Sequence, residues 1–485
     1  MGEIHLHGKI SFFVIFTLFA YQTALFSQVS RSNPGLSDKQ LLELLNDTTR
    51  RTARTGLADS VYVPPPGAKY TEIRSVDPAA PPAIIDIVGN LNNKKAFKLS
   101  DIASSVKYIQ LQQPPGTKIT SISDIVSDDD HIFVSTLQGL FCYAADGQYL
   151  YTLTDNELER SSTGVRIVSG VMSNPLSSTN IDLLDGQLTY RTYHWPSIDE
   201  GVTEAQLNIF DVNESDAQMR FNFQSGELKN KLAQPVFQRR LDPKKSGGGI
   251  FLNDQSFFIP NSLTTVSLYG DTVCKFSNFD RPMAAQRVTF FSYAYRVGNQ
   301  VMLQNDYNDT IFRVEPPNRL VPVYVMQWGA YKPDKNQYAA GSELEGKLVL
   351  DKWVETARYI FISYTEGRDY PIRRNQGKVL FHWALYDKTA KTLTHFLTSS
   401  TPPMVEITTG VLPYSAVFPP LIENDIEPVG MPFWPKGVNH NDEMYMIFSK
   451  EQIKNYITTG QFRNDKLQTI HDNMPDDGFC IMVVK

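Results

Sequence analysis

The residues Ile122 to Leu153, ISDIVSDDDHIFVSTLQGLFCYAADGQYLYTL, decide the fold of this chain. They contain four short β-prone runs, each bounded by turn residues. Asp128–Asp130 separates the first two runs, and Asp146-Gly147 before the last run suits the positive φ angles of a tight hairpin. Four antiparallel strands in this order make one blade of a β-propeller.

Weaker versions of this unit recur as far as the C-terminus, beginning near residues 165, 257, 290, 357 and 433. A single four-stranded sheet that is apolar on both faces is unstable, whereas blades stacked around an axis bury those faces. We therefore predict an all-β protein with a β-propeller over residues 84–485. A β-sandwich is the structural alternative, and the number of clusters alone permits five, six or seven blades.

Two β-rich runs at opposite ends of this region are suited to close the ring. They are Val106–Leu111 and Phe479–Val484. Pairing between them would place both ends of the propeller in one blade and leave only short free edges. We predict closure by these N- and C-terminal strands.

The first 27 residues are typical of a secretory signal. Lys9 precedes an apolar stretch, Ile10–Ala20, and the small residue Ser27 lies just before the expected cleavage point. The stretch is short for a bilayer span, which takes about 20 residues, so cleavage near Ser27 is favoured over an uncleaved anchor. We expect a periplasmic or extracellular protein.

Residues 28–83 form a separate region, predicted to be a short helix on a proline-rich linker. Ser37 and Gln40 can complete a capping box before a leucine-rich run. Pro64–Pro66 and Pro78–Pro82 then oppose regular hydrogen-bonded structure. We expect this region either to be mobile or to pack on the outside of the propeller.

Composition excludes some classes of function. The formal net charge is −6, with 46 Lys and Arg against 52 Asp and Glu, which gives no electrostatic basis for binding nucleic acid. Cys142, Cys274 and Cys480 are too far apart for a short-spacing metal or redox motif. Each lies in an apolar run, so we expect buried small side chains and at most one disulfide.

Four stretches spread over the chain resemble a family of exported six-bladed β-propellers of Bacteroidota, of TolB/NHL-like type. The first is Phe97–Leu111, and the second is Asn308–Val314 followed by Leu320–Tyr324. The third is Asn424-Asp425 with Pro432–Pro435, and the fourth is Asp472-Asn473 with the closing strand Gly478–Lys485. The resemblance implies six blades and export, but no activity, because the function of the family is mostly unassigned. The chain departs from the family in lacking a lipid-anchor cysteine near Ser27 and a glycine-rich segment at Glu157–Gly164.

Asn424, Asp425, Phe433 and Trp434 are the leading candidates for ligand contacts. A proline-rich loop with an exposed tryptophan suits stacking on a sugar or planar ligand, while the amide and the carboxylate fix polar groups. The alternative is that Trp434 packs between blades and Asp425 caps a turn.

Arg373 and Arg374 are the second set of candidates, because they form the most basic short loop. The guanidinium fork suits a carboxylate, sulfate or phosphate group. A solvated loop between strands is the alternative.

No metal or covalent catalytic motif stands out in the sequence. No two histidines have ligand spacing, and Asp128–Asp130 and Asn305–Asp309 do not fit an EF-hand, so no cofactor is expected and calcium is only a weak alternative. There is no Gly-x-Ser-x-Gly elbow. We predict a non-enzymatic module that binds a glycan, peptide or protein at the axial funnel. The alternative is a periplasmic hydrolase or lyase with active-site residues converging on the axis.

Overall fold

The structure, a computed structural model, describes part of the 485-residue chain. The described residues are 71–73, 81–161, 164–170, 181–184, 186–194, 204–211, 218–223, 236–240, 249–252, 261–266, 272–277, 292–305, 308–315, 319–334, 337, 344–367, 379–397, 404–409, 412–417, 421–427, 430–459 and 465–485. The predicted signal segment and the predicted helix after Ser37 lie outside them.

The four-stranded unit expected over residues 122–153 is present. It consists of β5 (Ile122–Ser127), β6 (His131–Thr136), β7 (Gly139–Ala144) and β8 (Tyr149–Asp155), hydrogen-bonded in that order as an antiparallel sheet. Asp128 Oδ1 accepts hydrogen bonds from the backbone N–H groups of Asp130 and His131, which fixes the first turn. Gly147 has a φ of 93°, as the last turn requires.

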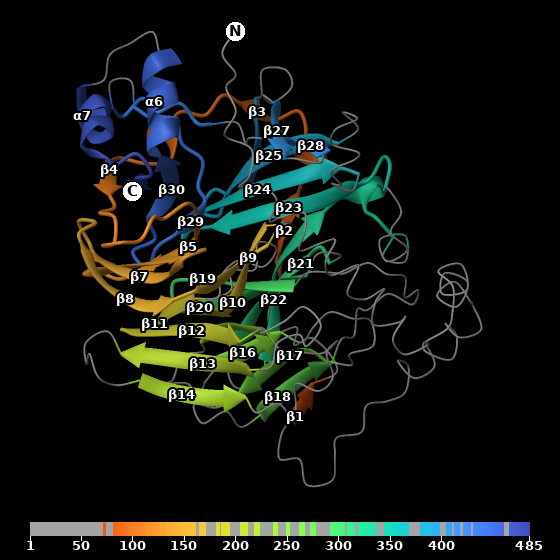
Figure 1. The fold of residues 1–485 in the computed structure, drawn as a ribbon. Coiled ribbons are helices and arrows are strands. Elements are labelled where there is room, and N and C mark those ends of the chain that lie inside the picture. Colours follow the sequence, from red (N-terminus) through yellow and green to blue (C-terminus); the bar gives the residue numbers. More distant parts are fainter. Residues whose placement is uncertain are drawn as a thin grey trace, which may run out of the picture.

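Further antiparallel sheets follow along the chain (Figure 1). The second contains β9 (Glu157–Ser161), β10 (Gly164–Gly170), β11 (Ile181–Leu184), β12 (Gln187–His194), β13 (Glu204–Asp211) and β14 (Gln218–Phe223). The third contains β15 (Val236–Arg240), β16 (Gly249–Leu252), β17 (Asn261–Val266) and β18 (Thr272–Ser277). The fourth contains β19 (Ser292–Val297), β20 (Gln300–Asn305), β21 (Thr310–Glu315) and β22 (Arg319–Gln327).

The fifth sheet contains β23 (Leu348–Glu355), β24 (Tyr359–Glu366), β25 (Leu380–Asp387) and β26 (Thr392–Phe396). A separate hairpin, β27 (Met404–Thr409) with β28 (Leu412–Val417), precedes the last sheet. The last sheet contains β29 (Gly437–Val438), β30 (Met444–Ser449), β31 (Phe479–Val484) and β4 (Val106–Gln110). Together the sheets form a β-propeller arrangement, and the protein is all-β apart from a few helices.

The segment before the propeller adds outer strands to three consecutive sheets. β1 (Thr71–Ile73) pairs in parallel with β18, β2 (Ala83–Asp86) with β22, and β3 (Lys94–Lys95) with β26. The prolines at 64–66 and 78–82 predict no regular structure in the linker, and β1 is an exception to this. Three residues between the proline clusters suffice for this short pairing, because none of them lacks a backbone N–H group.

The two strands predicted to pair across the ends of the propeller are partners. β31 runs antiparallel to β4, with residues 480 to 484 opposite residues 110 to 106. The ladder extends at both ends, because Leu111 N donates to Phe479 O at 3.0 Å and Lys485 N donates to Ser105 O at 3.1 Å. The C-terminal strand is thereby held between β30 and a strand from early in the chain.

Two helices lie between β30 and β31. They are α6 (Lys450–Thr459) and α7 (Asp465–Asn473), and Figure 1 shows them side by side at the end of the last sheet. Each buries an apolar residue, Ile453 and Leu467, in the core below. No helix among the described residues is both long enough and apolar enough to cross a membrane.

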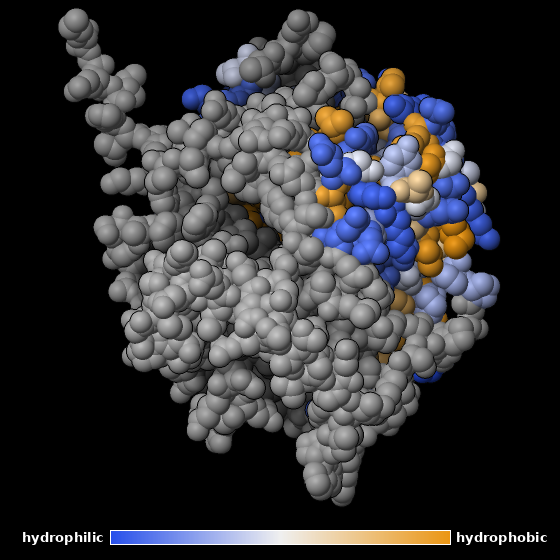
Figure 2. Space-filling model, turned by 90° about the vertical axis from the view of Figure 1, so that its right-hand side faces the viewer, coloured by the Kyte–Doolittle hydropathy of each residue, from blue (hydrophilic) through white to orange (hydrophobic). Residues whose placement is uncertain are grey.

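The core lies in the seams between neighbouring sheets. One cluster joins the fifth and last sheets, another the fourth and fifth, and another the first and last. Cys142, Cys274 and Cys480 are free, fully buried thiols, and burial raises the pKa of the Cys142 thiol to about 11. On the described part of one face, Figure 2 shows mainly hydrophilic residues with apolar side chains scattered among them, which is normal for a folded surface.

The docking of β2 can be tested with two adjacent isoleucines. Ile85 is fully buried in the seam between the fourth and fifth sheets, whereas Ile84 is 55% exposed. We expect Ile85→Ala to lower the free energy of unfolding by about 2–4 kcal/mol and Ile84→Ala to change it by less than about 0.5 kcal/mol. Denaturant unfolding measures both. Equal effects of the two substitutions would show that β2 does not dock as described.

Acid should weaken the contact between β26 and the segment before β3. His395 is buried, and its Nδ1–H donates to Asn90 O at 2.9 Å. Burial lowers the pKa of His395 below its ordinary value, against the opposing effect of this hydrogen bond. Below about pH 6.5, His395 is protonated more readily in the unfolded chain than in the folded chain. The free energy of unfolding should therefore fall as the pH falls below about 6.5.

A substitution isolates this contribution. We expect His395→Asn, whose amide can still donate to Asn90 O, to reduce the loss of unfolding free energy between pH 7.5 and pH 5.5. Chemical denaturation at the two pH values measures the change. A loss of the same size in the variant would mean that other groups cause the acid sensitivity.

Candidate functional site

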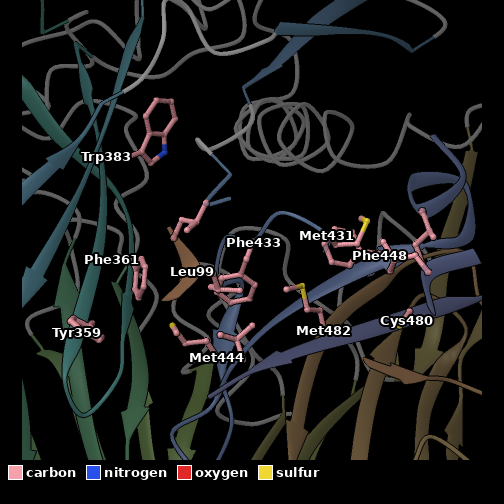
Figure 3. Close-up of a cluster of buried hydrophobic side chains, with 14 of the residues drawn as sticks. Leu99, Tyr359, Phe361, Trp383, Met431, Phe433, Met444, Phe448, Cys480 and Met482 are labelled. Carbon is pink, nitrogen blue, oxygen red and sulfur yellow. The ribbon is translucent and has the colours of Figure 1, made fainter. Parts of the chain in front are cut away.

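Phe433, one of the predicted ligand contacts, is a fully buried core residue. Its backbone pairs with that of Ile422 through two N–H to O hydrogen bonds of 2.7 and 2.9 Å, which fold residues 422–433 into a closed loop. Figure 3 shows the Phe433 ring among Leu99, Met444 and Met482, in the seam between the fifth and last sheets. The ring has no exposed surface to offer a ligand.

Asn424 stabilises this loop, and Asp425 joins it to the N-terminal segment at Ser100. Asn424 Oδ1 accepts from the N–H groups of Ile426 and Glu427 at 3.2 and 3.3 Å. Asp425 accepts from the N–H and hydroxyl groups of Ser100 at 2.9 and 2.6 Å, in the 3₁₀ turn η2 (Leu99–Asp101). These hydrogen bonds lower the pKa of Asp425. Both side chains therefore act on the local backbone.

Trp434 packs between two sheets. Its ring meets those of Phe361 and Phe396 edge-on, at centroid distances of 5.7 and 5.3 Å. The structure thus brings Asn424, Asp425, Phe433 and Trp434 into one region, with the packing and capping contacts that the alternative interpretation describes. Arg373 and Arg374, the second set of candidates, lie outside the described residues.

The role of Phe433 can be measured directly. A residue fully buried in such a core should cost about 3–5 kcal/mol of unfolding free energy when truncated to alanine. Leu421, which is 42% exposed and lies beside the same loop, provides the control. We expect Phe433→Ala to lower the denaturation midpoint strongly and Leu421→Ala to leave it nearly unchanged. Two variants of equal stability would refute the core assignment.

A different set of polar residues lies on the inner strands of the sheets. β11 lies beside β5 and β15, β15 lies beside β19, and β23 lies beside β29. These are the first strands of their sheets or, for β11, an additional strand paired with β12. Inner strands surround the central channel of a β-propeller, so their side chains are the natural place for a ligand site.

One ion pair joins inner strands of the second and fourth sheets. Arg296 on β19 donates through Nε and Nη2 to the two carboxylate oxygens of Asp182 on β11, at 3.2 and 2.7 Å. Both side chains are buried or nearly so. A bidentate pair of this kind satisfies the geometry of both groups, and we assign it to stabilising the inner ring.

Lys436 occupies the most informative position, directly before β29. Its N–H donates to Tyr445 O at 2.8 Å, and its Nζ donates to Ile122 O on β5 at 3.2 Å. The Tyr445 hydroxyl also reaches β5, where it donates to Ile125 O at 3.3 Å. It passes so close to Gly437 that a Cβ there would lie 2.5 Å from the hydroxyl oxygen. The side chains of Lys436 and Tyr445 therefore join the last sheet to the first.

Charged groups on two other sheets influence Lys436 electrostatically. Burial lowers the pKa of its ammonium, the carboxylate of Asp124 on β5 opposes this, and the ammonium of Lys352 on β23 adds to it. Lys436 and Lys352 are nevertheless exposed to solvent.

Both neighbouring strands are irregular at this point. The pairing of β5 with β6 shifts register between Ile122 and Asp124, and that of β23 with β24 shifts between Leu350 and Lys352. A β-bulge re-aims side chains and is common beside functional sites. We therefore identify Asp124, Lys352 and Lys436 as the candidate site. Sequence reasoning did not find them, because bulges and contacts between residues more than 80 positions apart leave no local signal.

The described residues offer no obvious metal site. Among them, no group of three or more His, Cys, Asp or Glu side chains is placed to hold an ion. Within the Asp-rich turn proposed as a weak calcium alternative, Asp128 Oδ1 already accepts backbone hydrogen bonds from Asp130 and His131. These contacts explain that turn by local chemistry.

Solved structures from several Bacteroides species are among those that match the chain. A B. fragilis protein described as exported is 11% identical, with a TM-score of 0.52 over 83% of this chain and 99% of that chain. A B. caccae protein of unknown function is 11% identical, with a TM-score of 0.32 over 60% and 94%. A DUF4221 member from B. vulgatus is 9% identical, with a TM-score of 0.32 over 60% and 84%. Only the first of these likenesses supports the fold.

Sequence comparison gives the family. None of the curated proteins compared matches the chain. A family model described as a domain of unknown function, DUF4933, matches residues 65–459, which include the outer strands β1 to β3 as well as the candidate site. The chain belongs to the DUF4933 family.

Proposed function

We propose that this protein is an exported, six-bladed β-propeller, closed by its N- and C-terminal strands, that binds a ligand at its axis. Six successive sheets with four or more strands among the described residues support the blade number. The ladder between β4 and β31 supports closure, since it joins the two ends of the propeller region in one sheet. Export is supported by the signal-like residues 1–27 and by the similar fold of an exported Bacteroides protein.

The observation that carries the binding role is the meeting of Asp124, Lys352 and Lys436. Asp124 and Lys352 lie on the inner strands β5 and β23, each beside a β-bulge, and Lys436 directly precedes β29 in a third sheet. Charged groups gathered in this way at the centre of a propeller add little to folding, because exposed charges contribute little stability. They are suited to orient a polar ligand, and a glycan or peptide is the proposed class.

Catalysis is the second candidate, and one observation favours it. The lowered pKa of Lys436 beside a carboxylate is the kind of perturbation that active sites use for acid–base chemistry. A hydrolase or lyase would use Lys436 and Asp124 for proton transfer. Turnover of a bound glycan or peptide, abolished by Lys436→Met, distinguishes this role from binding alone.

The test is a ligand screen on the exported form of the chain, followed by mapping of the bound site. A ligand that binds only the folded protein raises its melting temperature. We expect a hit among neutral and charged glycans and short peptides, and we expect it to slow backbone hydrogen exchange in β5 and β23. Outer strands such as β8 and β26 provide the internal control. Protection confined to the outer strands, or no hit at all, would contradict axial binding.

A further inference from the structure

The outer edges of the sheets are not all covered in the same way. In the third, fourth and fifth sheets, the outermost strand pairs with an added parallel strand from the N-terminal segment, namely β1, β2 or β3. In the second sheet the outermost strand is β14, which Figure 1 shows beyond β13, and no described strand pairs with its other side. Such an edge presents backbone N–H and C=O groups that can pair with a further strand.

The N-terminal segment covers its three edges at nearly regular intervals. Nine residues, 74–82, separate β1 from β2, and seven residues, 87–93, separate β2 from β3. The direction is also constant, because the segment passes from the third sheet to the fourth and then to the fifth. The same spacing and direction would bring the residues before β1 to the outer edge of the second sheet.

The sequence before β1 contains a strand-like run at the expected distance. In Ser60–Val63, two valines flank a tyrosine, and β-branched and aromatic residues favour strands. Pro64 biases the preceding Val63 toward an extended conformation. Seven residues, 64–70, separate this run from β1, the same number as between β2 and β3. A linker of this length therefore suffices to pass from one sheet to the next.

The second sheet is the one that this run reaches first. It lies between the first and third sheets, because β11 lies beside both β5 and β15. The outer strand of the first sheet, β8, is also a poorer partner. The backbone N–H of Tyr149, at the start of β8, already donates to Gln112 Oε1 at 3.1 Å.

We propose that Ser60–Val63 adds to the second sheet as a parallel strand beside β14. The register follows from the three observed cases, in which the added strand starts opposite the third residue of the outermost strand or a later one. These starting positions are Cys274 in β18, Tyr324 in β22 and His395 in β26. The same arrangement places Ser60–Val63 opposite residues 220–223, the last four of β14. One continuous segment would then cover the edges of four consecutive sheets.

Engineered disulfides test this pairing in the exported form of the chain. A disulfide needs Cα atoms about 4.4–6.8 Å apart, and paired strands lie about 4.8 Å apart. The matched double variants are Tyr62→Cys/Asn222→Cys and Ser60→Cys/Arg220→Cys. The mismatched controls combine the same four substitutions as Tyr62→Cys/Arg220→Cys and Ser60→Cys/Asn222→Cys. We expect the matched pairs to form at least tenfold more intramolecular disulfide under mild oxidation, as measured by non-reducing peptide mapping.

Hydrogen exchange tests the pairing without new cysteines. We expect the amides of residues 60–63 and of β14 to exchange slowly. Val61→Pro and Tyr62→Pro are made separately, because proline lacks the N–H donor and a parallel ladder uses the N–H groups of alternate residues. At least one of them should raise exchange in β14 tenfold or more. Ala58→Pro, outside the run, should leave it unchanged.

Each contrary result has a definite meaning. Fast exchange of residues 60–63 in the parent chain, or disulfides in the mismatched pairs alone, would overturn the proposed strand. Disulfides that join two chains into a covalent dimer would show that β14 pairs with a second copy, and would overturn the pairing within one chain. None of these measurements depends on a ligand at the axis, so they leave the proposed binding role to its own test.

Discussion

The need to pair the backbone groups at the outer edge of each sheet is the constraint on which the rest of this structure depends. A propeller covers the faces of its sheets by stacking them, but the last strand of every sheet still presents unpaired N–H and C=O groups. This chain covers three of those edges with its own N-terminal segment, as parallel strands β1, β2 and β3. The same segment continues through a single bridge from Lys98 to Glu423 and ends as β4 in the last sheet.

This arrangement makes the stability of distant sheets depend on one continuous stretch. Ile85 and Ile87 anchor it in the seam between the fourth and fifth sheets, and Leu99 anchors it in the next seam. Asp425 then holds the turn at Ser100. The loop predicted as a ligand site thus lies where the N-terminal segment reaches the last sheet, which explains why Phe433 is fully buried and Trp434 is partly buried.

Much of the architecture could be predicted from local patterns. The alternation and turn residues of Ile122–Leu153 specify one blade, because strand period and turn chemistry are properties of neighbouring residues. The pairing of β4 with β31 could also be predicted, because both β-rich runs lie at the ends of the propeller region and each needs a neighbouring strand. The outer strands β1 and β3 could not be predicted from the sequence. Strands of two or three residues have no periodic pattern, and their partners lie some 200 to 300 positions away.

The candidate site was beyond prediction for a related reason. Trp434 and Phe433 attract notice in a sequence because large aromatic residues are common in both binding sites and cores. Only burial separates the two cases, and burial here depends on Leu99 and Phe361 from elsewhere in the chain. Lys436, two residues after Trp434, attracts no notice, since one lysine among 46 basic residues has no local context that marks it.

The position of Lys436 argues that its charge is kept for a purpose other than folding. Burial disfavours the ammonium of Lys436, and the carboxylate of Asp124 opposes this effect. The hydrogen bond from Lys436 Nζ to Ile122 O is the one hydrogen bond of this ammonium among the described residues. Glycine at position 437 leaves room for the Tyr445 hydroxyl, because a Cβ there would lie 2.5 Å from the hydroxyl oxygen. A lysine held beside the inner strands in this way is better explained by contacts with a ligand at the axis than by folding alone.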